Sequence, residues 1–122
     1  MSKLKQDRKL SNHISLPKIS VVTVVRNAES TIEDTIISII SQTYPDLEYI
    51  VIDGQSQDKT NSIIQRYADN ICFYLSEEDG GIFDAMNKGA ELASGDWIIY
   101  MNAGDYFYTP DSLMQLKDAL KS

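Results

Sequence analysis

Three apolar runs in this chain each lead into polar residues that could hold a nucleotide or a metal ion. The first ends in Val25 before Arg26-Asn27, the second ends in Asp53, and the third leads into Asn102-Ala103-Gly104-Asp105. Amide and carboxylate oxygens accept hydrogen bonds from a base or ribose, and a carboxylate is a suitable ligand for Mg²⁺ or Mn²⁺. If the runs are parallel strands, these groups share one edge of a sheet, outside which parallel α/β sheets bind their ligands.

A further candidate is the acidic, glycine-bearing segment that precedes an expected helix at residue 82. Asp79 and Gly80 lie in it, and a helix N-terminus favours bound phosphate. Plainer interpretations exist for these positions as well. Asp53 and Gly54 form a common turn pair, so the Asp53 carboxylate could cap that turn. Residues 102–105 could be an ordinary loop turn before the last helix.

The elements that must position these groups alternate between strands and helices. Four runs rich in β-branched and apolar residues are typical of buried strands. The expected strands are 19–25, 47–52, 71–75 and 97–101, and the expected helices begin near residues 32, 59, 82 and 110. Strands and helices that alternate at this spacing predict an α/β fold, with an open, mainly parallel sheet flanked by helices.

Local signals predict where several of these helices begin and end. Ser30 and Glu33 have the spacing of a capping box at the start of the first helix. Asp58 is expected to cap the second helix, from about residue 59 to residue 68. Gly95 is expected to give the third helix a left-handed stop, and Pro110 the last helix its first residue.

Length and charge limit the partners of the protein. The chain has 122 residues, which is enough for one domain, and its net charge is -7. Residues 1–18 carry +4 and the remainder −11. The strong negative charge of residues 19–122 repels phosphate polymers, which argues against nucleic acid as the partner. A divalent cation could still bridge the protein to one small anion. We expect residues 1–17 to be a flexible basic tail that could touch an anionic membrane surface, at about 1 kcal/mol per basic residue.

The single cysteine and the absence of long apolar runs bear on location. Cys72 has no partner for a disulfide, and its apolar surroundings in sequence predict a buried thiol. No secretory signal follows the basic start, and no apolar run approaches the roughly 20 residues of a membrane helix. We therefore expect a cytoplasmic protein, with any membrane contact at the inner face.

Three other functional classes fit the motifs poorly. No Gly-x-Gly-x-x-Gly follows the first strand and no Gly-x-x-x-x-Gly-Lys-[Ser/Thr] occurs, which argues against a dinucleotide-binding dehydrogenase and a P-loop enzyme. A phospho-receiver signalling domain shares the length and the acidity. It needs an acidic pair after the first strand, where this chain has Arg26-Asn27.

Taken together, residues 19 to about 116 resemble the nucleotide-sugar-binding half of the inverting family 2 glycosyltransferases, which have the GT-A fold. Five blocks occur in the order and spacing of that family, and together they are specific. They are Val22-Thr23-Val24-Val25-Arg26-Asn27-Ala28, Ser38-Ile39-Ile40-Ser41-Gln42-Thr43-Tyr44, Ile50 to Thr60 around Asp53-Gly54-Gln55-Ser56, Asp79-Gly80-Gly81-Ile82-Phe83-Asp84-Ala85-Met86-Asn87-Lys88-Gly89, and Ala93-Ser94-Gly95-Asp96-Trp97.

The resemblance implies roles for the candidate residues. Asp53 would bind the nucleotide base in a pocket bordered by Val25 to Asn27, and Asp79-Gly80 and Asn102-Ala103 would complete the nucleotide site. Asp105 would be the ligand of a bridging Mg²⁺ or Mn²⁺ within the family's Asp-x-Asp position. The donor would be a UDP- or GDP-linked sugar, transferred with inversion to a glycan or lipid-linked acceptor hydroxyl. The motif variants resemble a subgroup of bacterial surface-polysaccharide synthesis.

The chain departs from the family pattern at two points. Asn102 and Gly104 stand where acids are usual, which leaves Asp105 as the one charged residue of that motif. No general base is identifiable either, because in the family it comes from the acceptor half, beyond the metal motif. We therefore expect the domain at 18–122 to lack its acceptor half and to be inactive alone. A truncated, non-catalytic nucleotide-sugar-binding or interaction protein is the alternative. An exposed helix face left by the missing half would favour a homo-oligomer.

Overall fold

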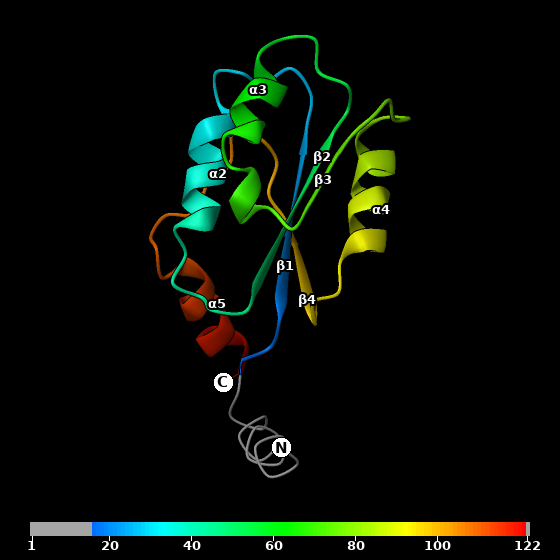
Figure 1. Ribbon diagram of the computed structural model, residues 1–122. Helices are drawn as coiled ribbons and strands as arrows, with labels where there is room; N and C mark the ends of the chain where they lie inside the picture. The colour runs from blue at the N-terminus through cyan, green and yellow to red at the C-terminus, as the bar shows by residue number, and fades with distance from the viewer. Residues whose placement is uncertain (1–15, 122) are drawn as a thin grey trace, which may run out of the picture.

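The computed structural model describes residues 16–121, so residues 1–15 and 122 lie outside the description, as does most of the basic tail predicted above. Figure 1 shows one sheet with helices on both sides. The elements in chain order are β1 (Ile19–Val25), α2 (Ile32–Ile40), β2 (Leu47–Asp53), α3 (Thr60–Gln65), a 3₁₀ helix (Ala68–Asn70), β3 (Phe73–Ser76), α4 (Ile82–Leu92), β4 (Trp97–Tyr100) and α5 (Ser112–Lys121).

The four strands form one parallel sheet in the order β3-β2-β1-β4, which confirms the predicted α/β architecture. Val25, the last residue of β1, lies opposite Asp53 at the end of β2. Asp53 in turn lies opposite Ser76 at the end of β3. The carboxyl ends of the strands therefore meet along one edge of the sheet, as the sequence predicts.

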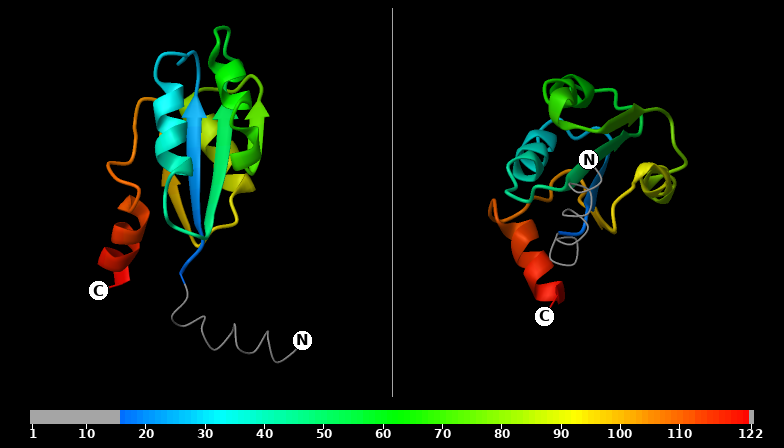
Figure 2. Two further views of the ribbon diagram at one scale, coloured as in Figure 1. Left: turned by 60° about the vertical axis from the view of Figure 1, so that its left-hand side comes forward. Right: turned by 60° about the horizontal axis from the view of Figure 1, so that its bottom comes forward.

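The chain reverses its direction of travel across the sheet at β1. It passes from β1 to β2 and β3, and then returns through α4 to place β4 on the other side of β1. Parallel crossovers are right-handed, so this reversal puts α4 on the opposite face from α2 and α3 (Figures 1 and 2). Helix α5 lies on the α2 side, where its Leu113 is part of the buried core.

Strand β1 is buried along its whole length because helices cover it from both sides. Val21 and Val25 belong to the core on the α2 side, while Val22 and Val24 belong to the core on the α4 side. Helix α4 comes close at Gly89, where an added Cβ would lie 2.4 Å from Cγ1 of Val22. The nearly continuous apolar sequence of β1 follows from this two-sided burial.

A hydrogen-bonded carboxylate ties the opposite edge of the sheet together, where the strands begin. Buried Glu48 accepts hydrogen bonds from the Ser20 hydroxyl at 2.7 Å and from the Ser94 N–H and hydroxyl at 2.9 Å each. Burial opposes ionisation, but these bonds and nearby Lys18 together hold the pKa of Glu48 below its usual value. Gly95 is required here because an added Cβ would lie 2.5 Å from the Ser20 hydroxyl.

The predicted capping box at the first helix does not form. Thr31 is the N-cap residue of α2, and it makes no side-chain capping bond. Glu33 instead accepts a hydrogen bond from the Tyr67 hydroxyl at 2.5 Å and pairs with Arg66 at 3.5 Å. Glu33 therefore ties α2 to the segment after α3, and this tertiary contact replaces the local one.

The other predicted helix ends differ in detail. The predicted left-handed stop at Ser94-Gly95 is wrong, because α4 ends at Leu92, the C-cap residue Ala93 is extended and Gly95 has no positive φ. Pro110 lies two residues before α5, in the preceding turn. Asp58 does accept hydrogen bonds from the N–H and hydroxyl of Thr60, the first residue of α3, although this helix ends at residue 65 rather than 68.

The prediction that Cys72 is buried is wrong, since the thiol is exposed. Strand β3 begins one residue later, at Phe73, and lies at the edge of the sheet. Phe73 itself is 43% exposed. Because β3 is an edge strand, only part of its apolar run is buried. The remaining apolar side chains of the run face solvent.

Candidate functional site

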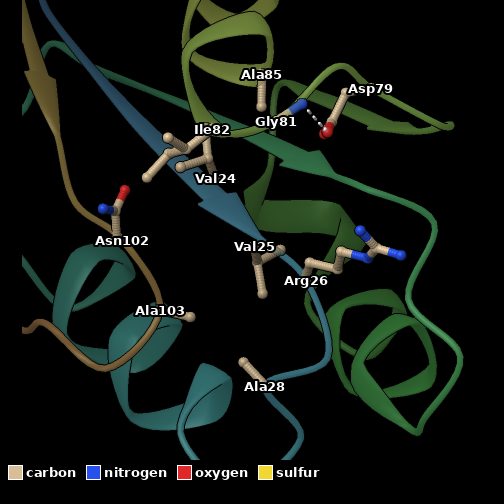
Figure 3. Close-up of a pocket in the computed structure, with 10 residues that line it drawn as sticks. All are labelled: Val24, Val25, Arg26, Ala28, Asp79, Gly81, Ile82, Ala85, Asn102 and Ala103. Atoms are coloured by element: carbon tan, nitrogen blue, oxygen red, sulfur yellow. Dashed lines mark hydrogen bonds between the residues drawn. The ribbon is translucent and has the colours of Figure 1, made fainter.

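A cavity of about 360 Å³ lies at the carboxyl edge of the sheet, between the end of β1, the start of α4 and the segment after β4 (Figure 3). This is the point where the strand order reverses, at which α/β sheets bind ligands. The lining residues are Val24, Val25, Arg26, Ala28, Asp79, Gly81, Ile82, Ala85, Asn102 and Ala103.

The cavity combines an apolar wall with three polar side chains. Val24, Val25 and Ile82, together with three alanines, supply its apolar side chains. In Figure 3, Asn102 stands on one side of the cavity, while Arg26 and Asp79 stand on the other. Apolar side chains together with a few placed polar groups are typical of small-molecule sites.

Two aspartates shape the loop that leads into α4. Asp79 accepts a hydrogen bond from the Gly81 N–H at 3.0 Å, and Asp84 accepts one from the Gly80 N–H at 2.9 Å. The hydrogen bond from the Gly80 N–H lowers the pKa of the Asp84 carboxyl below its usual value, and nearby Lys88 lowers it further. Partial desolvation opposes this shift without reversing it. Gly81 has φ +113°, a conformation that favours glycine. The loop is therefore fixed by its own side chains beside the helix N-terminus.

Asp53 is not among the residues that line the cavity. Its side chain is fully buried and accepts hydrogen bonds from the Ser56 hydroxyl at 2.5 Å, the Ser56 N–H at 2.9 Å and the Ser76 hydroxyl at 2.8 Å. Asp53 thus holds the loop after β2 against the end of β3. Its neighbour Gly54 contacts Asp79, since an added Cβ would lie 2.8 Å from the Asp79 carboxylate.

Asn27 belongs to the same hydrogen-bonded loop assembly. Its backbone N–H donates to the Ser56 hydroxyl at 2.8 Å, and its side-chain oxygen accepts from the Gln57 N–H at 2.7 Å. Asn27 has φ +51°, which asparagine tolerates better than most residues. The loops after β1 and β2 are therefore locked together at the edge of the site.

The segment after β4 carries an unsatisfied acceptor. The side-chain oxygen of Asn102 is buried and has no hydrogen-bond partner within the described part of the chain. Thr35 anchors the following turn, because its hydroxyl donates to the Asp105 carbonyl at 2.7 Å and accepts from the Gly104 N–H at 3.0 Å. The Asp105 residue is exposed. An acceptor left open beside a cavity is suited to a ligand donor or a cation.

The structure brings some of the predicted site residues to the cavity and leaves others behind it. Val25, Asp79, Asn102 and Ala103 line the cavity, whereas Asn27, Asp53, Gly80 and Asp105 do not. All eight lie at or just beyond the carboxyl edge. Sequence reasoning did not name the lining residues Val24, Ala28, Ile82 and Ala85 as site residues, and it included Arg26 only in the pocket border from Val25 to Asn27. Their nearness to named positions in the chain was the available signal.

A comparison with protein families decides which family this chain belongs to. The family model described as Glycosyl transferase family 2 matches residues 20–122, which is most of the chain. The chain belongs to glycosyl transferase family 2. The predicted resemblance is thereby confirmed, and the phospho-receiver alternative is excluded.

The family 2 assignment agrees with individual relatives. An uncharacterized glycosyltransferase of Mycobacterium tuberculosis is 36% identical over 107 residues, which cover 87% of this chain and 41% of the relative. The chain therefore spans about two fifths of the length of that relative.

Two solved glycosyltransferase structures share the fold. The mannosyltransferase PcManGT from Pyrobaculum calidifontis, in complex with GDP-Man and Mn²⁺, has a TM-score of 0.76 and 27% identity, covering 88% of this chain and 32% of that one. S. aureus TarS 1-349, in complex with UDP-GlcNAc, has a TM-score of 0.72 and 27% identity, covering 85% and 30%. The GT-A architecture of this family 2 chain is thus shown.

The oxygen ligands that this family 2 chain offers suit a cation only if a substrate supplies further ligands. Among residues 16–121, no group of three or more His, Cys, Asp or Glu could hold a metal ion. The open oxygen of Asn102 and the exposed carboxylate of Asp105 are the oxygen groups of the motif after β4. Mg²⁺ and Mn²⁺ sites often combine one or two protein oxygens with substrate phosphates and water. These residues fit that kind of site.

Proposed function

We propose that this chain is the donor-binding part of a glycosyltransferase, which moves a sugar from a nucleoside diphosphate to an acceptor hydroxyl in glycan or polysaccharide synthesis, with inversion. The cavity at the reversal point between β1 and β4 is the observation that carries the proposal. Its apolar wall and the N-terminus of α4 suit a nucleoside diphosphate, because a helix N-terminus attracts phosphate. The match to family 2 supports the same conclusion.

The proposed nucleotide site has lining residues and supporting residues. Val25, Asp79, Asn102 and Ala103 line the cavity and would touch the donor. Gly80, Asn27 and Asp53 would support the site by fixing the loops that surround it. For Asp53 this is a different role from the direct base contact that the resemblance implies, because its carboxylate is fully buried and already accepts three hydrogen bonds.

We further propose that Mg²⁺ or Mn²⁺ binds together with the donor. Asp105 would be the charged protein ligand, with the Asn102 oxygen as a second one, and the donor diphosphate would complete the site. When bound, such a cation offsets the negative charge that develops on the departing diphosphate. Asp105 is held in place through its carbonyl by Thr35, so its side chain remains available.

The direct test of the proposed function is nucleotide binding. Isothermal titration calorimetry of the protein with UDP and with GDP, each with and without Mn²⁺, is expected to show binding of at least one nucleotide that strengthens with the cation. The matched variant Asp105→Asn is expected to lose the cation effect and keep the fold. If neither nucleotide binds at millimolar concentration with Mn²⁺, the proposal is wrong.

The acceptor and the location are also proposals. We propose a glycan or lipid-linked acceptor and a cytoplasmic enzyme whose basic residues 1–17 touch the inner face of the membrane. No helix in the described part of the chain is long and apolar enough to span a membrane. Sedimentation with anionic and with neutral vesicles tests the membrane contact, and equal binding to both would contradict it.

A further inference from the structure

One of the five sequence blocks described above lies away from the cavity. The block from Ser38 to Tyr44 covers the end of α2 and the turn after it, and the lining of the cavity does not include it. Its apolar residues Ile39 and Tyr44 are buried in the core. Its polar residues bind the segment that joins β4 to α5, which runs beside α2 in Figure 2. These polar residues need an explanation beyond core packing.

Two hydroxyl groups of α2 hold the turn that carries Asp105. The fully buried Thr35 hydroxyl donates to the Asp105 carbonyl at 2.7 Å and accepts from the Gly104 N–H at 3.0 Å. Ser38, one helical turn later, accepts from the Phe107 N–H at 3.1 Å and donates to the Thr35 carbonyl at 2.9 Å. The backbone before and after the Asp105 side chain is therefore fixed from α2.

The residues just after α2 hold the other end of the same segment. The side-chain amide of Gln42 donates to the Thr109 carbonyl at 2.7 Å, and its oxygen accepts from the Leu113 N–H at 3.0 Å. The Thr43 N–H donates to the Pro110 carbonyl at 2.8 Å. The connection from β4 to α5 is therefore tethered at both ends to α2 and the turn after it.

The composition of the motif after β4 makes this tethering informative. Asp105 is its one charged residue, because Asn102 and Gly104 stand where acids are usual. A single exposed carboxylate binds a divalent cation weakly unless its position is fixed before the cation arrives. Removing the groups that hold a metal ligand in place typically costs about 10- to 100-fold in metal affinity. The hydrogen bonds from α2 therefore matter more here than in a motif with several acids.

We propose that Thr35 and Ser38 are positioning residues that hold Asp105 in place for the divalent cation of the donor complex. This inference rests on the proposed function. Both side chains act through the backbone of the turn, since they bind the N–H and carbonyl groups of Gly104, Asp105 and Phe107. Thr35 is the principal one, because its hydroxyl binds Asp105 itself and is shielded from water. The polar side of α2 thus serves the cation site from outside the cavity.

The test measures cation binding and nucleotide binding separately. Mn²⁺ is titrated into the full chain with saturating UDP or GDP, and free Mn²⁺ is followed by electron paramagnetic resonance. Binding of the same nucleotide without a cation is followed by titration calorimetry. Thr35→Val, which keeps the shape of the side chain but removes the hydroxyl, is expected to weaken Mn²⁺ binding by about tenfold and to leave cation-free nucleotide binding unchanged. Thr35→Ser, which keeps the hydroxyl, is expected to bind Mn²⁺ as the natural chain does.

Hydrogen exchange of the Gly104 amide gives a readout that needs neither cation nor nucleotide. This N–H donates to the buried Thr35 hydroxyl, so its exchange should be slow in the natural chain and in Thr35→Ser, and faster in Thr35→Val. Ser38→Ala is a second variant, because it removes only the acceptor of the Phe107 N–H and should lose less Mn²⁺ affinity. If Thr35→Val does not fold, Mn²⁺ binding by Ser38→Ala decides the question.

Thr23→Val is the matched control, because Thr23 is also a fully buried threonine, and its hydroxyl is hydrogen-bonded to the Tyr49 hydroxyl at 2.9 Å. It is expected to bind Mn²⁺ as the natural chain does. An equal loss of Mn²⁺ binding in Thr23→Val and Thr35→Val would overturn the proposal in favour of a general loss of stability.

The remaining outcomes separate this proposal from the proposed function. Unchanged Mn²⁺ binding in Thr35→Val and Ser38→Ala would overturn the positioning role and leave the proposed function intact. UDP or GDP binding by the natural chain that Mn²⁺ does not strengthen would overturn the positioning role and the cation site, but not donor binding. Absence of any nucleotide binding by the natural chain would overturn both proposals.

Discussion

At the scale of single residues, buried carboxylates hold this domain together at both edges of its sheet. Asp53 fixes the loops at the carboxyl edge, and Glu48 fixes the strand starts at the opposite edge. Each accepts three hydrogen bonds, which offset the cost of burying a polar group. Removing either should therefore cost more than removing an exposed acid.

The first prediction concerns Asp53. Asp53→Ala leaves the Ser56 N–H and the hydroxyls of Ser56 and Ser76 without their acceptor. We expect the free energy of unfolding to fall by about 2–4 kcal/mol, since each orphaned buried donor costs about 1–3 kcal/mol. Urea denaturation measures this change. Asp46→Ala, which removes an exposed acid, should change stability by less than about 0.5 kcal/mol, and an equal loss in both variants would contradict the argument.

The second prediction concerns the pH dependence of stability at Glu48. Its pKa is lowered by folding from an ordinary value of 4.5, so the ionised form stabilises the fold above that pH. This contribution is lost as the pH falls from 4.5 through the folded-state pKa. We expect Glu48→Gln to be less stable than the natural chain near neutral pH, with a difference that shrinks below pH 4.5. A difference that stays constant with pH would contradict this assignment.

At the scale of elements, the close packing of α4 on the sheet positions one wall of the cavity. Gly89 allows this approach because a side chain there would collide with Val22. Gly89→Ala is expected to lower the free energy of unfolding by about 1–3 kcal/mol through overpacking, despite the better helix propensity of alanine. Thermal denaturation measures this change. Asn87→Ala, on the exposed side of the same helix, is the control and should not destabilise the protein.

Elements whose structure depends on contacts close in sequence could be predicted well, whereas features that depend on contacts distant in sequence could not. The isoleucine stripe of α2 and the apolar run of β1 mark faces that are buried, and both elements occur as predicted. The capping box failed because Glu33 contacts Tyr67, which is distant in sequence. Burial of Cys72 failed because an apolar run does not reveal that its strand lies at a sheet edge.

The location of the site in the fold could be predicted from the sequence, but the contacts within the site could not. Parallel strands bring the polar residues of the strand ends to one edge, and the sequence indicates this edge. The sequence does not indicate that the Asp53 carboxylate is bonded to Ser56 and Ser76, because these partners come from two other segments. It also does not show that the side-chain oxygen of Asn102 has no hydrogen-bond partner among the described residues, since this depends on the whole cavity wall.

At the scale of the whole molecule, the exposed apolar side chains bear on self-association. Phe83 at the start of α4 is 77% exposed, and Ile98 and Tyr100 on β4, an edge strand, are 41% and 39% exposed. Exposed apolar residues on an open sheet edge favour contact with another surface. We predict that the isolated chain forms a homo-oligomer at high concentration, and that Phe83→Ser reduces it. Light scattering that shows only monomer in the natural chain would contradict this prediction.

The composition of the cavity also limits what this chain can do alone. Asp79 is the one carboxylate on its lining, and it already holds the Gly81 N–H. Inverting transfer needs a general base beside the acceptor hydroxyl. We therefore expect the isolated chain to bind the donor without transferring its sugar. Turnover of UDP- or GDP-sugars to a glycan acceptor, followed by nucleotide release, would show this expectation to be wrong.

The most direct test of the donor site is amide chemical-shift mapping with UDP or GDP and Mg²⁺. The account predicts that the largest shifts occur at Gly81, Asn102 and Ala103, around the cavity where the strand order reverses. Ser94 and Glu48, at the opposite edge of the sheet, should not move. Shifts confined to that opposite edge, or no shifts at saturating nucleotide, would contradict the account.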